Sequence, residues 1–181
     1  MRLTKWGYYA DFVLYPALVV ALGLHALWRE PSNLAGDWAL AVLGGVVAWT
    51  FLEYLLHRVV LHHLQPFKRW HELHHARPLD LIGTPSWLSA GLFLALWLVL
   101  AQATEADVAG GVTAGLMLGY LGYVLVHCAV HNRRARAGSW LFDAKLRHAL
   151  HHHAQGPCNF GVSTGLWDAV FGTGGNPLRR S

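Results

Sequence analysis

The sequence predicts an all-α, polytopic membrane protein with four transmembrane helices, arranged as two hairpins, and a cytoplasmic, histidine-rich helical cap. Three observations support this fold class. Of the 181 residues, 54% are hydrophobic and only 13% are charged, whereas soluble domains carry roughly 25% charged residues. Four apolar stretches come close to the length of about 20 residues that a helix needs to cross a bilayer. Most of the 13 histidines lie just outside those stretches.

The predicted spans lie near residues 11–28, 36–56, 86–104 and 107–126. Residues 30–37 are rich in proline, glycine and polar side chains, and residues 102–109 are polar and acidic. Such short connections predict that each pair of spans forms a helical hairpin. Span four contains Gly111, Gly115 and Gly119 at every fourth position. A stripe of this kind lets another helix approach closely in lipid.

The positions of Lys and Arg predict the orientation in the membrane. Thirteen of the 14 lie before span one, between spans two and three or after span four, and only Arg29 lies on the other side. The positive-inside rule therefore places both termini and residues 57–85 in the cytoplasm. Because the basic residues bracket apolar spans, the net charge of +4 does not indicate a nucleic-acid partner. We expect residues 1–181 to form a single integral-membrane domain with a metal-binding cap at 57–85 and 127–175.

Ten of the histidines form four tight clusters, all on the predicted cytoplasmic side. Residues three and four apart share a helix face, which applies to three clusters, whereas His57 and His62 are five apart, with His62 expected just past a helix end. Each cluster can thus direct two or three imidazoles toward one point. Neutral imidazole is a common ligand for iron, zinc and copper, and one ion uses only a few ligands, so ten candidates predict two ions. The candidate metal ligands are His57, His62, His71, His74, His75, His127, His131, His148, His151 and His152. We interpret His25, His63 and His153 as packed or interfacial side chains.

One cluster also contains a competing motif. The segment from His71 through Glu72 to His75 satisfies H-E-x-x-H, the helix signature of zinc proteases in which the glutamate is the general base. A membrane zinc metalloprotease is therefore an alternative function from a different class. One zinc needs three protein ligands and a water, which would leave most of the other clusters without a role. His74 also shares the helix face with His71 and His75, so H-x-x-H-H describes the cluster better.

At these residues the chain resembles the fatty acid hydroxylase/sterol desaturase superfamily of membrane di-iron enzymes, and most of all the fatty acid 2-hydroxylases. The four histidine boxes that carry the resemblance are 57–62, 71–75, 127–131 and 148–152. The segment from His74 to Asp80 is similar to the family's H-H-x-x-P-x-D, and residues 159–173 are similar to its closing G-F/V-G…W-D…F-G-T element. One departure is Tyr123-Val124, where the 2-hydroxylases commonly have Tyr-Asp before the third box.

The resemblance implies an O₂-dependent di-iron oxidoreductase that hydroxylates a membrane lipid, a fatty acyl chain or a ceramide-type substrate. The ten box histidines would share two iron ions, with O₂ as cosubstrate, and zinc can substitute in purified protein. A desaturase and a carotenoid- or sterol-type hydroxylase of the same superfamily remain alternatives. Acidic side chains that accept the second ring N–H commonly orient ligating imidazoles. Glu53, one helical turn before His57, is the first candidate for this role, followed by Asp80 and Asp168.

Hydroxylation requires two electrons from a donor for each O₂, and the sequence has neither a nucleotide-binding G-x-G-x-x-G loop nor the cysteines of an iron–sulfur cluster. We therefore expect a separate electron donor, a cytochrome b5-like protein or a ferredoxin with its reductase. A basic surface on the cytoplasmic side is the expected docking site. Its residues are Arg133, Arg134, Arg136, Lys145 and Arg147.

Overall fold

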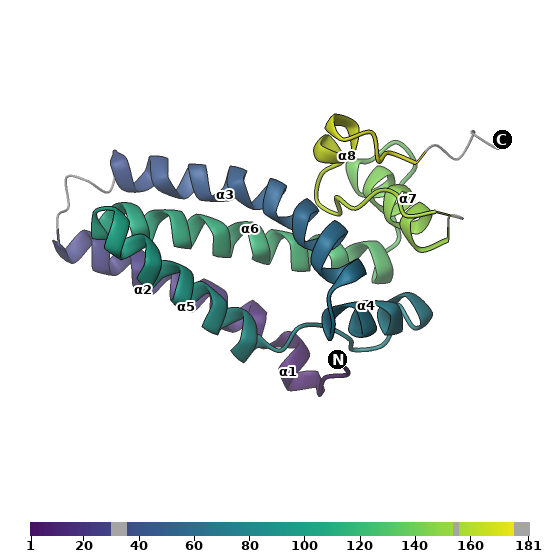
Figure 1. The fold of residues 1–181 in the computed structure, drawn as a ribbon, viewed down its shortest axis with the longest axis horizontal. Helices are drawn as coiled ribbons and strands as arrows, with labels where there is room; N and C mark the ends of the chain where they lie inside the picture. The colour runs from purple at the N-terminus through teal and green to yellow at the C-terminus, as the bar shows by residue number, and fades with distance from the viewer. Residues whose placement is uncertain (30–35, 154–155, 176–181) are drawn as a thin grey trace. The chain divides into compact units, whose positions relative to one another are not determined.

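The computed structural model describes residues 1–29, 36–153 and 156–175. These residues form helices and one isolated β-bridge, with no strand among them, which confirms the all-α prediction. The helices are α1 (Lys5–Tyr9), α2 (Asp11–Arg29), α3 (Asp37–Leu55), the π-helix η2 (Leu56–Leu61), α4 (Phe67–Ala76), α5 (Ser86–Ala103), α6 (Ala106–Asn132), α7 (Trp140–His153) and α8 (Leu166–Val170) (Figure 1). Most of the turn predicted at 30–37 lies outside the described residues.

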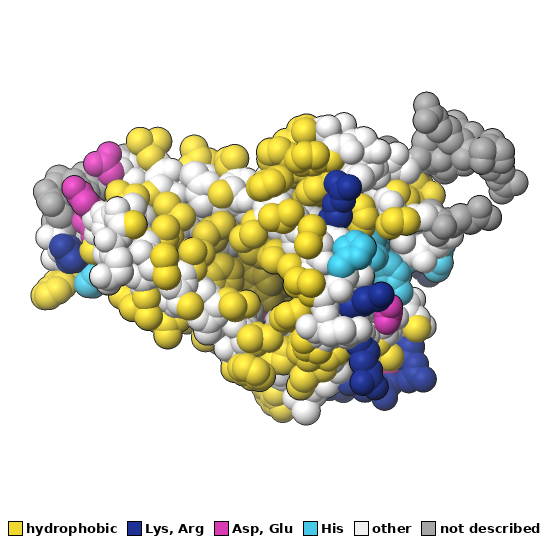
Figure 2. All heavy atoms as spheres, in the orientation of Figure 1, with side chains coloured by type: hydrophobic (Ala, Val, Ile, Leu, Met, Phe, Trp, Pro, Cys, Tyr) yellow, Lys and Arg dark blue, Asp and Glu magenta, His cyan; other side chains and the backbone are white. Residues whose placement is uncertain are grey.

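Four helical segments are long and apolar enough to cross a membrane, which confirms the four predicted spans. They are Lys5–Arg29, Asp37–Leu61, Ser86–Ala103 and Ala106–Asn132. Their exposed side chains are largely hydrophobic, as for Val13, Leu40 and Val99, and Figure 2 shows such side chains covering much of one face of the molecule. A helix satisfies its backbone hydrogen bonds internally and can therefore lie in lipid. The chain is thus an integral membrane protein.

The helix α6 is longer than the predicted fourth span. That span was expected to end near residue 126, but α6 continues to Asn132. The extra turns carry His127 and His131, which lie one turn apart on the same helix. The difference arises because the prediction followed apolar length, whereas the helix continues through His127, His131 and Asn132.

The described chain divides into two compact units, one formed by Met1–Trp49 with Leu81–Leu121 and the other by Thr50–Asp80 with Gly122–Ser181. In the first unit α3 and α6 pack backbone against backbone. A Cβ atom on Gly45 would collide with the carbonyl of Val112, and one on Gly115 would collide with the carbonyl of Val42. The predicted glycine stripe therefore does bring two helices together, as small residues do in membranes.

The interior of the first unit contains polar groups that are paired with one another. The hydroxyl of Tyr15 donates to Oγ of Ser89 at 2.6 Å, and the hydroxyl of Tyr120 donates to Oδ2 of Asp11 at 2.7 Å. The rings of Tyr15 and Tyr120 pack edge to face with centroids 4.9 Å apart. Lipid offers no hydrogen bonds, so these pairs link α2, α5 and α6 at a point where polar side chains would otherwise be unfavourable.

The second unit contains the end of α3, η2, α4, the end of α6, α7 and the C-terminal segment with α8. The C-terminal segment packs on the end of α3. The ring of Phe171 stacks on Tyr54 with centroids 5.3 Å apart and planes at 12°, and Nε1 of Trp167 donates to Oγ1 of Thr50 at 3.0 Å. All ten clustered histidines belong to this unit, so one compact body positions them all.

Candidate metal centre

A π-helical turn places the first two histidines together. His57 lies within η2, and His62 follows as its C-terminal cap residue. An α-helix would bring residues three or four apart to one face, whereas a π-helical turn closes between residues five apart. The five-residue spacing of His57 and His62 matches that turn, and their ring centroids are 5.4 Å apart. Single π-turns inside α-helices occur frequently at functional sites.

The other histidines lie on α-helices at spacings that share a face. His71, His74 and His75 are on α4, and His148, His151 and His152 are on α7. The helical periodicity predicted for both three-histidine clusters is therefore confirmed. A sequence cluster does not correspond to one metal site, however. The imidazoles converge in two groups in space, and α4 and α7 each contribute side chains to both groups.

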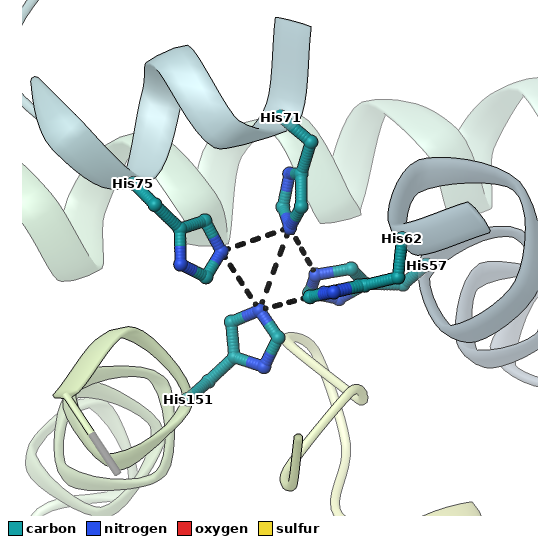
Figure 3. A group of neighbouring side chains, drawn as sticks. All are labelled: His57, His62, His71, His75 and His151. Atoms are coloured by element: carbon teal, nitrogen blue, oxygen red, sulfur yellow. Dashed lines mark hydrogen bonds between the residues drawn. The ribbon is translucent and has the colours of Figure 1, made fainter. Parts of the chain in front are cut away.

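The first group consists of five imidazoles whose Nε2 atoms converge, as Figure 3 shows. They belong to His57, His62, His71, His75 and His151. Within this group the Nε2 atom of His71 lies 3.0 Å from that of His57 and 2.9 Å from that of His75. The Nε2 atom of His151 lies 3.0 Å from that of His75 and 3.3 Å from that of His62.

The second group consists of His74, His131, His148 and His152, and His127 lies against it. The Nε2 atoms of His148 and His131 are 2.8 Å apart, and those of His152 and His148 are 3.1 Å apart. The Nε2 atom of His127 is 3.0 Å from that of His74 and 3.2 Å from that of His131. All ten predicted ligands are thus brought into two neighbouring groups of imidazoles. The stacked rings of His75 and His152, 4.1 Å apart, join the two groups.

These spacings fit metal coordination. With metal–nitrogen bonds of about 2.0–2.1 Å, neighbouring ligand nitrogens lie about 3.0 Å apart in octahedral and about 3.4 Å apart in tetrahedral coordination. The Nε2–Nε2 distances of 2.8 to 3.5 Å in the two groups cover that range. Hydrogen bonding alone accounts for the groups poorly, because a neutral imidazole carries a single ring proton. One cation can instead accept all the converging lone pairs.

The backbone determines which ring nitrogens of the first group are unprotonated. Nδ1 of His57 lies 2.5 Å from the carbonyl oxygen of Phe160, and Nδ1 of His151 lies 2.7 Å from the carbonyl oxygen of Cys158. A carbonyl can only accept, so each Nδ1 carries the proton and each Nε2 presents a lone pair. Both lone pairs point into the first group. Phe160 itself is buried and its ring lies edge-on to His57 and His62, which excludes water from that side.

Burial keeps the imidazoles neutral. It is the largest cause that lowers the pKa of His62 to about 4 and that of His75 to about 3, and the neighbouring imidazoles lower both pKa values further. In the second group burial likewise lowers the pKa of His74 and of His152 to about 3. The neutral form is the one that binds a metal ion. Both groups are therefore ready to bind metal near neutral pH without losing protons.

Of the three predicted acidic residues, two are buried against the C-terminal segment and one is only half-buried. Glu53 and Asp168 are buried, with 3% and 2% of their surface exposed, and both accept hydrogen bonds from backbone N–H groups of the C-terminal segment. The sequence predicts that these acids accept the ring protons of imidazoles, but the ring protons of His57 and His151 point to carbonyl oxygens of that segment. Asp80 is half-buried and pairs with Arg77 at 3.9 Å, three residues earlier.

The remaining histidines and Glu72 lie outside the two groups. His25, His63 and His153 are exposed, and His25 lies near Trp28, with ring centroids 6.4 Å apart. The side chain of Glu72 is 63% exposed and forms an ion pair with Lys68 at 3.8 Å. Glu72 thus faces away from the imidazoles of its own helix, which is not the position of a general base for a zinc-bound water.

Four membrane-length helices and two groups of imidazoles able to hold metal ions define the class of protein, an integral membrane protein with a polyhistidine centre. A family model described as fatty acid hydroxylase matches residues 42–173. Because this match covers most of the sequence, the chain belongs to the fatty acid hydroxylase family.

Relatives and a solved structure agree with this assignment. The chain is 35% identical to a fatty acid 2-hydroxylase of Macaca fascicularis, over 93% of this chain and 48% of that protein. It is 32% identical to a dihydroceramide fatty acyl 2-hydroxylase of Arabidopsis thaliana, over 74% of this chain and 60% of that one. A structure of full-length scs7p, in which only the hydroxylase domain is visible, matches with a TM-score of 0.82 and 25% identity, over 95% of this chain and 68% of that chain. The chain spans about half the length of the mammalian relatives it matches.

Proposed function

We propose that this protein is an O₂-dependent di-iron hydroxylase that introduces a hydroxyl group into a membrane lipid, a fatty acyl chain or a ceramide-type substrate. The observation that carries the proposal is the pair of converging imidazole groups in one compact unit of a fatty acid hydroxylase family member. Its relatives named above are fatty acid and dihydroceramide fatty acyl 2-hydroxylases. A long, apolar substrate also fits a chain whose exposed surface along the spans is apolar.

In this proposal the ten histidines hold two iron ions, five imidazoles in the first group and five around the second. A bound iron pair supplies the O₂ chemistry that hydroxylation of an unactivated C–H bond requires and that these side chains lack. The net reaction converts C–H, O₂, two electrons and two protons into C–OH and water. The side chains of this protein contribute neutral ligands, fixed ring orientations at His57 and His151, and an apolar wall at Phe160.

The two electrons come, in this proposal, from a separate cytochrome b5-like protein or a ferredoxin with its reductase. The basic surface expected to receive the donor is smaller in the structure than in the sequence. Arg133, Arg134 and Arg136 are exposed, whereas Lys145 is half-buried and donates to the carbonyl oxygen of Arg133 at 3.0 Å. Arg147 is also half-buried, beside Gly165. We therefore assign docking to the three exposed arginines.

The distribution of Lys and Arg supports a topology in which both termini and the metal centre face the cytoplasm. We further propose that residues 1–181 form a single membrane domain, whose predicted cap at 57–85 and 127–175 lies largely within the second unit. Accessibility labelling tests the topology in a protein whose Cys128 and Cys158 are replaced by serine and which carries one new cysteine, at Gly138 or at Gly36. We expect the cytoplasmic reagent to reach the first position and the external reagent to reach the second.

Lipid profiling tests the reaction. Cells that express the protein are compared with cells that express His71→Ala, and the lipids are analysed by mass spectrometry. We expect a lipid class that gains one oxygen only with the intact protein. A loss of two hydrogens in the same comparison would identify a desaturase instead. If the protein were a zinc protease, Glu72→Gln would abolish its activity. If it is a hydroxylase, the exposed, ion-paired position of Glu72 predicts that the Glu72→Gln variant remains active.

A further inference from the structure

The segment 158–163 connects two buried acids to two histidines of the first group. On one side, its carbonyl oxygens at Cys158 and Phe160 accept the ring protons of His151 and His57. On the other side, its backbone N–H groups donate to carboxylates. A stretch of six residues thus accepts hydrogen bonds from imidazoles and donates hydrogen bonds to acids.

Each acid binds two backbone amides of this segment. Oε1 of Glu53 accepts from the N–H of Val162 at 2.7 Å and of Ser163 at 2.9 Å. The carboxylate of Asp168 accepts from the N–H of Phe160 at 2.9 Å and of Gly161 at 2.8 Å. Hydrogen bonds to an ionised acceptor are roughly twice as strong as neutral ones. Four such bonds hold the backbone between Phe160 and Ser163 in one conformation.

A backbone turn at Asn159 directs the two carbonyls to different histidines. Asn159 has φ of 54°, in the left-handed region that asparagine adopts more readily than most residues. Its N–H donates to the carbonyl oxygen of Thr173 at 2.9 Å, and its Oδ1 accepts from the N–H of Gly175 at 3.0 Å. The turn is therefore held from within the C-terminal segment, and the carbonyls before and after it meet His151 and His57.

We infer that Glu53 and Asp168 are positioning residues that act through the 158–163 segment to fix the tautomer and orientation of His57 and His151, and that they thereby retain the metal ion of the first group. The inference rests on the proposed function, because it requires that the two groups bind metal. It applies to the first group alone. In the second group the Nδ1 atoms of His148 and His152 are buried and have no hydrogen-bond partner among the described residues.

The test uses Glu53→Gln and Asp168→Asn, which keep the shape of each side chain and remove its charge. Matched controls are Glu72→Gln and Asp143→Asn, whose side chains are exposed. The full-length proteins are purified in detergent and loaded with zinc, which is diamagnetic. The readouts are zinc per chain, helical content by circular dichroism, and the ring N–H proton resonances of His57 and His151 in protein with ¹⁵N-labelled histidine.

We expect two zinc ions in the wild type and in both controls, and close to one in Glu53→Gln and Asp168→Asn, with unchanged helical content. Zinc affinity at the first group should fall roughly 10- to 100-fold, the usual effect of changing a residue that orients a ligand. The two ring N–H resonances should broaden or vanish in these variants alone. A purely structural role would reduce both sites together and would not select these resonances.

Retention of both zinc ions and both resonances in the variants would overturn the inference, and so would equal loss from the two groups. If Glu53→Gln does not fold, Ser163→Ala replaces it, because this substitution removes only the hydroxyl that donates to Glu53. If Asp168→Asn does not fold, Thr173→Val replaces it, because this substitution removes the hydroxyl that donates to Asp168. The same selective loss, smaller in size, is then expected, and its absence overturns the inference. Fewer than two zinc ions in the wild type would reject the metal pair itself, and with it the role that rests on that pair.

Discussion

The two imidazole groups of the second unit are built in different ways. The first depends on a π-helical turn and on backbone carbonyls from a distant segment, which set the ring protons of His57 and His151. The second depends on side chains that share faces of α4, α6 and α7, and the described residues provide no acceptor for Nδ1 of His148 or His152. Backbone carbonyls therefore fix ring orientations in the first group, and the described residues provide no such acceptor for His148 and His152 in the second.

Removal of one ligand from each group should have the largest effect. His151→Ala is expected to leave one metal ion at the second group, and His148→Ala to leave one at the first. Changing a residue that only orients a ligand typically lowers activity roughly 10- to 100-fold. Both alanine variants should lose more activity than this, because the proposed chemistry needs both ions. Metal analysis and lipid hydroxylation assays on the same preparations measure this. An active protein with a single metal ion would refute the joint role of the groups.

Acid should act on both groups alike. Burial lowers the pKa of His75 in the first group and of His74 in the second to about 3, compared with about 6.5 in an unfolded chain. The unfolded state therefore binds more protons between these pH values, so this contribution to stability is complete above pH 6.5 and is lost as the pH falls toward 3.

The metal-free protein should melt at progressively lower temperatures as the pH is lowered from 7.5 to 4.5. For a chain of this size each kcal/mol corresponds to roughly 2–4 °C. A melting temperature independent of pH would contradict the buried, neutral state of these imidazoles.

A backbone substitution should separate the groups. Asn159→Val forces a β-branched residue into the left-handed region at φ of 54°, at a cost of roughly 1–2 kcal/mol. Asn159→Gly retains that conformation and serves as the matched control. We expect the valine variant to lose metal from the first group only, measured as metal per chain, and the glycine variant to retain most of it. Equal metal content in the two variants would show that the turn does not support the first group.

The smallest effect is expected at the docking surface. Arg133, Arg134 and Arg136 follow α6, the helix that brings His127 and His131 to the second group. Replacing the three with glutamate should slow reduction by an acidic donor several-fold, with the difference shrinking at high salt because exposed charges are screened. Stopped-flow reduction with cytochrome b5 measures the rate, and metal content should be unchanged. An unaltered reduction rate would place the donor elsewhere.

Much of this architecture could be predicted from the sequence because its determinants are local. Apolar length located the four spans, and α-helical spacing predicted the shared faces of α4 and α7. The glycine stripe predicted the close approach of α3 and α6 at Gly115. The family resemblance implied that all ten histidines share two ions, and their predicted position on the cytoplasmic side agreed with it.

Two ions were predicted, but which histidines form each group could not be, because the grouping depends on contacts distant in sequence. His57 pairs with His71 and His151, and Glu53 binds amides about 110 residues further along the chain. The carbonyls of Cys158 and Phe160 carry no sequence signal, since every residue has one. One signal was available, however. The five-residue spacing of His57 and His62 fits a π-turn, and that turn is what the structure contains at Leu56–Leu61.

The most direct test of the central claim is the metal content of iron-replete protein, purified under reducing conditions and measured by mass spectrometry. Two groups of converging imidazoles predict close to two irons per chain, reduced to about one in either His151→Ala or His148→Ala. A single tightly bound zinc, or one iron that neither substitution removes, would contradict the two-metal centre and the hydroxylase that is built on it.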